Sequence, residues 1–203
     1  MEKQTSMKSD SVRLDHKVIL DIVEPDSRVL DLGCGDGSLL QLLVTEKNAR
    51  AQGIEFADSQ IHKCVAKGVS VFHGDIDTGL SEYPDQSFDY IILNQSMQEV
   101  VKVDFVLSEA LRVGQKVIVG FSNFAYYKAR MDLFFKGRVP VTESLPNQWY
   151  ATPNLHFLSI RDFEDYCAHK NIRILTKYCL GEHTLIHFLP NLRALNAIFV
   201  ISK

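Results

Sequence analysis

The chain has 203 residues, of which 46% are hydrophobic and 23% charged, as expected for a globular protein with a substantial core. Its net charge of −3, without any cluster of Lys and Arg, predicts no nucleic-acid-binding surface. The sequence holds no apolar run near the roughly 18–20 residues of a membrane span, no apolar secretory signal and no C-x-x-C pair. We therefore expect a cytoplasmic protein with reduced thiols.

The chain is expected to form one domain, residues 11–203, after a polar and disordered tail, residues 1–10. The first helix begins near Ser11 and ends before Pro25, which cannot continue a helix. The apolar residues of this stretch follow helical spacing: Leu14, Val18, Ile19 and Ile22.

Short apolar strands then alternate with helical patterns. The predicted strands are 28–32, 51–55, 69–73, 88–93 and 116–121. The predicted helices between them cover about 37–46, 58–67 and 105–112. Asp58 is the expected N-cap of the second of these helices, and Gly68 ends it. This alternation predicts a parallel, doubly wound α/β sheet.

The pattern changes after residue 123. Segment 124–159 interrupts the alternation, and such an insertion either packs a helix and a loop onto the sheet or forms a lid or partner-binding surface. A helix near 162–170 and two strand-like stretches, 172–180 and 194–202, complete the chain. The segment holds eight of the chain's 20 aromatic residues, where its length predicts three or four: Phe124, Tyr126, Tyr127, Phe134, Phe135, Trp149, Tyr150 and Phe157.

A glycine-rich turn follows the first strand, with glycine at positions 33, 35 and 37. Glycine tolerates positive φ and lets a ligand approach the backbone, and the following helix offers free N–H groups. We therefore expect a nucleotide-like ligand at the carboxyl end of this strand. Ser38 stands where the dinucleotide fingerprint needs its third glycine, and the Asp31 carboxylate suits an ammonium group but repels a pyrophosphate. NAD(P) binding and a turn without a ligand are the alternatives.

The spacing from Asp31 to Gly37 resembles motif I of the class I S-adenosylmethionine (SAM) methyltransferases. The fold of these enzymes is a Rossmann-like, doubly wound sheet of seven mostly parallel strands with an antiparallel last strand, which the two C-terminal strands would complete. The resemblance implies SAM as cofactor and its demethylated form, S-adenosylhomocysteine (SAH), as product or surrogate. Cys34 is interpreted as a small residue in a tight turn and not as a nucleophile.

Acidic residues end the second and third predicted strands. Glu55 lies 20 residues after Gly35, where a carboxylate accepts hydrogen bonds from ribose hydroxyls; a surface carboxylate is the alternative. Phe56 follows it and could pack against the adenine edge. Asp75, next to Ile76, occupies a place where methyltransferases often bind the adenine amine, although it could simply form a turn.

Asn94 and Gln95 end the fourth strand, beside the expected methyl group. Their amides either hold the ligand or satisfy nearby backbone groups. Since the carboxyl ends of neighbouring parallel strands meet at one edge, we expect a single site there. The predicted cofactor-binding residues are Asp31, Gly33, Cys34, Gly35, Gly37, Glu55, Phe56, Asp75, Ile76, Asn94 and Gln95.

The sequence predicts no metal site and assigns no catalytic residue. His183 and His187 are spaced i, i+4, but no third ligand joins them. His156 could act as a base, although a structural hydrogen bond is the favoured interpretation. The candidate contacts to a substrate or partner are Gln98, Trp149, Tyr150 and His156.

From Ser11 to its C-terminus the chain resembles the methionine biosynthesis protein MetW family. The resemblance implies a SAM-binding, methyltransferase-like protein that acts beside homoserine O-acyltransferase. An active SAM-dependent methyltransferase on an unidentified small molecule is the alternative. Departures from the family pattern at 56–57, 121–128 and Ala151 put inherited substrate contacts of the aromatic segment in doubt. The matching segments are 29–37, 74–80, 84–93, 111–114, 137–142, 149–150, 152–156 and 160–163.

Overall fold

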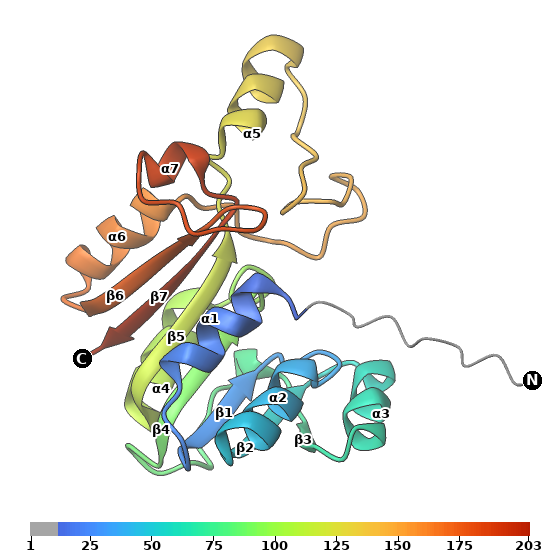
Figure 1. Ribbon diagram of the computed structural model, residues 1–203, viewed down its shortest axis with the longest axis vertical. Helices are drawn as coiled ribbons and strands as arrows, with labels where there is room; N and C mark the ends of the chain where they lie inside the picture. Colours follow the sequence, from blue (N-terminus) through green and yellow to red (C-terminus); the bar gives the residue numbers. More distant parts are fainter. Residues whose placement is uncertain (1–11) are drawn as a thin grey trace, which may run out of the picture.

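The computed structural model describes residues 12–203, which form a seven-stranded sheet with helices on both faces (Figure 1). The strand order is β3-β2-β1-β4-β5-β7-β6. Strands β1 to β5 pair in parallel, whereas β7 is antiparallel to both of its neighbours. The strands are β1 (Arg28–Leu32), β2 (Arg50–Glu55), β3 (Ser70–His73), β4 (Phe88–Asn94), β5 (Gly114–Ser122), β6 (Arg173–Leu180) and β7 (Asn196–Ser202).

Seven α-helices are present in this part of the chain, with one 3-10 turn (η1, Ile76–Thr78) and one π-helix (η2, Asp132–Lys136). In the described residues, no helix combines the length and apolar character needed to cross a bilayer. The α-helices are α1 (Leu14–Ile22), α2 (Ser38–Lys47), α3 (Asp58–Ala66), α4 (Val103–Val113), α5 (Tyr127–Met131), α6 (Ile160–His169) and α7 (Pro190–Arg193).

The core lies in two layers, one on each face of the sheet. Tyr90 and Ile92 of β4 pack on the same side as α1 and α2. Ile91 and Leu93, which alternate with them, pack on the side of α4 and α6. Because both faces of the central strands are covered, the middle of each strand is apolar. Their polar residues lie toward the strand ends.

The predicted fold class and the predicted strands and helices are confirmed, with boundaries that shift by a few residues. The N-cap prediction for α3 was wrong. Ala57 is the N-cap, Asp58 is the first helical residue, and the Ala57 N–H donates to Glu55 (2.9 Å). Helix α7 and the short helices of the aromatic segment were not predicted. The expectation for residues 1–10 lies outside the described residues.

The strand order reverses direction between β1 and β4, which are neighbours although two strands separate them in the chain. In open α/β sheets a crevice forms at such a point, outside the carboxyl ends of the strands. The loops after β1, β2, β3 and β4 therefore meet at one edge, where the predicted site residues lie.

Candidate functional site

The turn after β1 is held tightly against the neighbouring elements. Gly33, Gly35 and Gly37 all have positive φ, between 55° and 76°. A Cβ on Gly33 would lie 2.6 Å from the Cβ of Ser96, so this position has no room for a side chain. The backbone N–H groups of Gly33 and Cys34 donate to the carbonyl of Ile54 in β2 (2.8 and 3.2 Å). The turn is therefore fixed in place by the end of the adjacent strand.

Glu55, at the end of β2, orders the backbone on both sides of the edge. One carboxylate oxygen accepts from the Gly35 N–H (2.8 Å), and the other accepts from Phe56 and Ala57 (2.9 Å each). A Cβ on Gly35 would meet nothing within 4 Å, so the backbone is open on the side away from the sheet. Since a carboxylate offers about four acceptor sites, Glu55 can still bind a ligand hydroxyl.

Two adjoining cavities lie along this edge, and we call them together the groove. The larger, of about 510 Å³, is bordered by eight predicted residues: Gly33, Gly35, Glu55, Phe56, Asp75, Ile76, Asn94 and Gln95. The smaller, of about 360 Å³, is bordered by Asp31 and Cys34 and shares Gly33, Gly35, Gln60 and Asn94 with the larger one. The structure thus brings ten of the eleven predicted cofactor-binding residues together. Gly37 lines neither cavity, because it packs against Cys64 and Val69.

Asp31 is the most unusual group of the groove. It lies on β1 and is only 3% exposed, and within residues 12–203 its carboxyl accepts no hydrogen bond from a side chain or backbone group. Burial and the nearby negative charge of Glu55 raise the pKa of Asp31 to about 7. Asp31 borders the smaller cavity, and its oxygens are not sealed from it, so their donors come from water or from a ligand.

The end of the groove beside Phe56 and Asp75 is less enclosed. Phe56 is 69% exposed, and its ring centroid lies 5.9 Å from that of His73. Asp75 accepts from the backbone N–H of Asp77 (2.9 Å) and caps η1. The turn-forming interpretation of Asp75 is therefore observed, while its side chain also borders the larger cavity.

Cys34 has the properties of a packing residue. Its Sγ lies 3.9 Å from that of Cys64, and burial raises the pKa of its thiol far above the ordinary value. A thiol in such surroundings stays protonated at neutral pH, which agrees with the interpretation that Cys34 is not a nucleophile.

Two groove residues at the start of the first helix, Arg13 and His16, and their neighbour Asp15 were not identified from the sequence. The Arg13 guanidinium makes two hydrogen bonds to Asp15 (2.5 and 3.1 Å), and Asn94 donates to Asp15 (2.9 Å), which joins α1 to the end of β4. His16 is buried and borders the smaller cavity, and burial lowers its pKa. Asp15 precedes Ile19 by four residues and so falls on the apolar face of the helix, a signal that could have indicated it.

The four candidate substrate or partner contacts lie outside the groove. Gln98 is 1% exposed; its side chain accepts from the Ser122 N–H (2.9 Å), and its carbonyl accepts from Leu155 and His156. The Nε2 of His156 lies 2.9 Å from the Val100 carbonyl, so the structural interpretation of this histidine is the one observed. Trp149 and Tyr150 are 70% and 73% exposed and pack edge to face.

The histidine pair lies in the loop between β6 and α7. His183 and His187 are not helical there, so the i, i+4 spacing does not place them on one face. Across residues 12–203, no three His, Cys, Asp or Glu side chains are grouped to hold a metal ion.

Comparison with known proteins places the chain in a family. Residues 13–201 match the family described as methionine biosynthesis protein MetW. The chain belongs to the MetW family. A bifunctional methionine biosynthesis protein MetXA/MetW from Rhodopirellula baltica is 34% identical over 183 residues, which cover 85% of this chain. The chain spans 29% of the length of that relative.

Solved structures agree with the MetW family in fold. A SAM-dependent methyltransferase from Thermotoga maritima, described as a possible histamine N-methyltransferase, has a TM-score of 0.66 and 17% identity, and the match covers 94% of this chain and 88% of that chain. The [4+2]-cyclase SpnF has a TM-score of 0.67 and 17% identity, with 93% and 80% covered. These likenesses confirm the class I methyltransferase fold.

We predict that Asp31→Asn stabilises this MetW-family protein at alkaline pH. The folded-state pKa of Asp31 is about 7 and the ordinary value is 3.8, so the folded protein loses stability as the pH rises between these values. The neutral amide avoids this loss. The gain should be on the order of 1–4 kcal/mol at pH 8 and smaller at pH 5, measured by urea unfolding.

Asp89→Asn is the matched control, because the hydrogen bonds from Arg28 lower the pKa of Asp89. This carboxylate stabilises the folded state above its ordinary pKa, so its neutral variant should lose stability at pH 8. An Asp31→Asn protein that is less stable than the wild type at pH 8 would contradict the assignment.

Proposed function

We propose that this MetW-family protein binds SAM in the groove and acts in methionine biosynthesis together with a homoserine O-acyltransferase. The observation that carries the proposal is the buried Asp31 carboxyl, which borders the groove without a donor from residues 12–203. The alternative is an active SAM-dependent methyltransferase on an unidentified small molecule.

The groove has suitable partners for each part of SAM. Asp31 would bind the ammonium of the amino-acid tail, because a cation supplies both the charge and the donors that the carboxyl lacks. Asn94 borders both cavities, and its amide is held from behind them: Nδ2 donates to Asp15 (2.9 Å), and the buried Oδ1 lies against Gly120. Glu55 would accept from the ribose hydroxyls, and the exposed ring of Phe56 would pack against adenine, with Asp75 beside its amine.

Bound SAM would supply a methyl group made electrophilic by its sulfonium. The chain contributes binding and orientation, and positioning can provide a large share of the barrier reduction for transfer. A proton acceptor for a substrate is harder to assign. His156 is engaged with a carbonyl, and the Cys34 thiol is buried and protonated. These contacts favour a binding function over catalysis. The fold itself does not decide between binding and methyl transfer, because SpnF has a similar fold and is named a [4+2]-cyclase.

The name of the fused relative supports the proposed partnership with a homoserine O-acyltransferase. In that protein a MetW part is joined to a MetXA part in one chain. The aromatic segment of this chain offers a surface for such a partner. Figure 1 shows α5 and the loop after it extending beyond the carboxyl end of β5. We call the following residues, each 50–82% exposed, the aromatic tip: Met131, Leu133, Phe134, Phe135, Trp149 and Tyr150. Large exposed apolar side chains of this kind mark protein interfaces.

The loop of residues 95–100 connects the groove to the aromatic segment. Gln95, Ser96, Glu99 and Val100 line the larger cavity. The backbone of the same loop accepts hydrogen bonds from 155–156, through the carbonyls of Gln98 and Val100. A ligand that contacts this loop can therefore change how the aromatic segment is held. Such coupling requires that the ligand bind the free and partnered states with different affinity.

We predict that SAH binds the purified protein and that Phe56→Ala weakens this binding by about fivefold or more, because base–aromatic stacking is lost. Isothermal titration calorimetry measures the affinity for SAH. In the same experiment, NADH is expected not to bind. Phe72→Ala is the matched control: Phe72 is 52% exposed on the neighbouring strand β3 and lines neither cavity of the groove. Equal SAH affinity in both variants, or no SAH binding by the wild type, would contradict the proposal that SAH binds in the groove.

We also predict that the protein co-purifies with homoserine O-acyltransferase and that SAH changes the affinity of the pair. Trp149→Ala combined with Tyr150→Ala should reduce association at least tenfold, as expected when an interface loses two exposed aromatic anchors. Val65→Ala with Phe72→Ala, exposed on α3 and β3 at the opposite edge of the sheet, is the control. If the wild-type proteins do not associate, either with or without SAH, the proposed partnership is refuted.

A further inference from the structure

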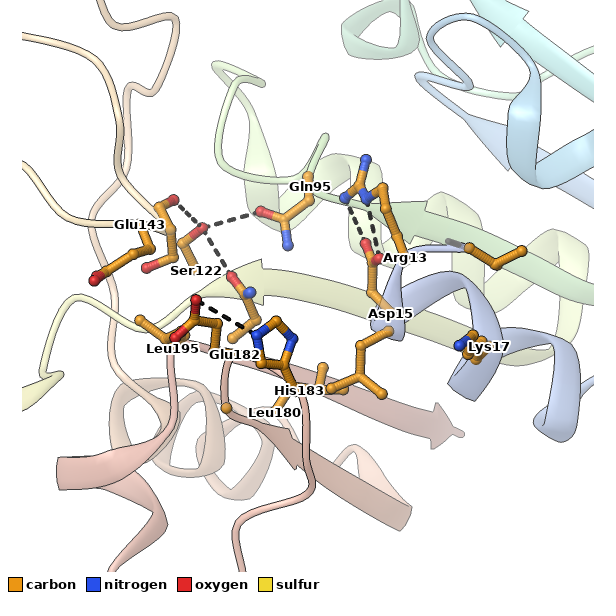
Figure 2. A pocket seen from close by; sticks show the side chains of 15 residues that line it. Arg13, Asp15, Lys17, Gln95, Ser122, Glu143, Leu180, Glu182, His183 and Leu195 are labelled. Carbon is orange, nitrogen blue, oxygen red and sulfur yellow. Dashed lines mark hydrogen bonds and ion pairs between the residues drawn. The ribbon is translucent and has the colours of Figure 1, made fainter. Parts of the chain in front are cut away.

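A second cavity, of about 680 Å³, lies next to the groove and is not part of it (Figure 2). It shares Gln95 with the larger groove cavity and Arg13 with the smaller one, so it opens beside the end of β4. The aromatic segment closes one side through 143–144, and the loop after β6 closes another through 180–183. No part of the proposed SAM site requires this space.

Ser122, the last residue of β5, lies in the wall of this cavity and is 3% exposed. Its hydroxyl lies 2.7 Å from the carbonyl oxygen of Ser144, 3.1 Å from Gln95 Oε1 and 3.2 Å from Asn196 Oδ1. Figure 2 shows these contacts radiating from Ser122. A hydroxyl has one hydrogen and can satisfy one of the three oxygens. No other donor from residues 12–203 reaches them, so the wall has acceptors in excess.

Most charged side chains of the cavity are already paired. The Arg13 guanidinium is bound to Asp15 through two hydrogen bonds, and Glu143 forms an ion pair with Lys128. Lys17 and Glu182 also line the cavity. Glu182 is exposed, and its nearest cationic candidate is the His183 ring, whose Nε2 lies 3.6 Å away and is charged only when protonated. The negative charge of Glu182 is therefore available to a ligand.

These features select among ligand classes. An anion would meet the acceptors around Ser122 and the Glu182 carboxylate, which is unfavourable. A metal ion is disfavoured, because residues 12–203 contain no cluster of three metal-ligating His, Cys, Asp or Glu side chains. A primary ammonium has three donors and a positive charge, which match the acceptors around Ser122 and the Glu182 carboxylate.

We propose that this cavity binds a small molecule that carries a primary ammonium group, with its N–H groups directed at the oxygens around Ser122. Glu182 contributes the opposing charge from the loop after β6. Because Ser144 belongs to the aromatic segment, such a ligand also joins this segment to the ends of β5 and β7. The cavity is thus a second small-molecule site, which lies next to the proposed SAM site and shares Arg13 and Gln95 with it.

Three probes of similar size and different charge test the proposal: n-butylammonium, butyrate and n-butanol, titrated into the full chain at constant ionic strength. We expect n-butylammonium alone to shift the ¹H–¹⁵N resonances of residues 122, 144, 182 and 196 at millimolar concentration. Glu182→Gln should weaken this binding about two- to fivefold, and Asn196→Asp should strengthen it by a similar factor, as for partly exposed charge pairs. Thermal unfolding confirms that both variants are folded.

SAH titrated into the same samples reports the groove separately, so loss of SAH binding and loss of ammonium binding are distinguishable. Both variants should bind SAH with wild-type affinity. Butyrate binding as strong as that of n-butylammonium would overturn the proposal. The absence of shifts at the four residues would do so too, as would ammonium binding that neither substitution changes.

Discussion

The proposed site at the switch point of the sheet rests on one buried carboxyl, that of Asp31, which has no hydrogen-bond donor among residues 12–203. Hydrophobic packing covers both faces of β1, so the carboxylate has little contact with water, and burial raises its pKa to about 7. A protein that served stability alone would place an apolar or amide side chain there. The three glycines of the turn beside it contribute no side chains to the space, and Glu55 orders the backbone of the turn without neutralising Asp31. These features support the proposal that a ligand brings a cation to this point of the groove.

The same edge of the sheet also supports the surface features of the protein. The loop after β4 contacts the groove on one side and holds residues 155–156 on the other. Ser122 at the end of β5 joins Gln95 to the carbonyl of Ser144 in the aromatic segment. A cofactor in the groove, an amine in the second cavity and a partner on the aromatic tip would all act on elements that these few hydrogen bonds connect. This arrangement suits the proposed function, in which a partner protein senses the ligand state.

The sequence predicted the sheet well, because apolar strands covered on both faces and their glycine or acidic ends are local patterns. It also predicted most of the groove, since motif residues at successive strand ends must meet at one edge. The sequence predicted the hydrogen-bond partners of individual side chains less well. The buried Gln98 binds Ser122 and the backbone of 155–156, contacts that depend on how distant segments pack. Likewise Arg13, Asp15 and His16 look like an ordinary helix start in the sequence. The docking of α1 against β4, through the hydrogen bond from Asn94 to Asp15, brings Arg13 and His16 to the groove.

The most direct test of the central claim is a crystal structure of the protein with SAH. We predict that SAH lies in the groove with its amino group within hydrogen-bond distance of the Asp31 carboxyl, its ribose hydroxyls at Glu55 and its adenine beside Phe56. A complex in which SAH occupies another part of the surface would contradict this placement. So would a complex in which its amino group turns away from Asp31.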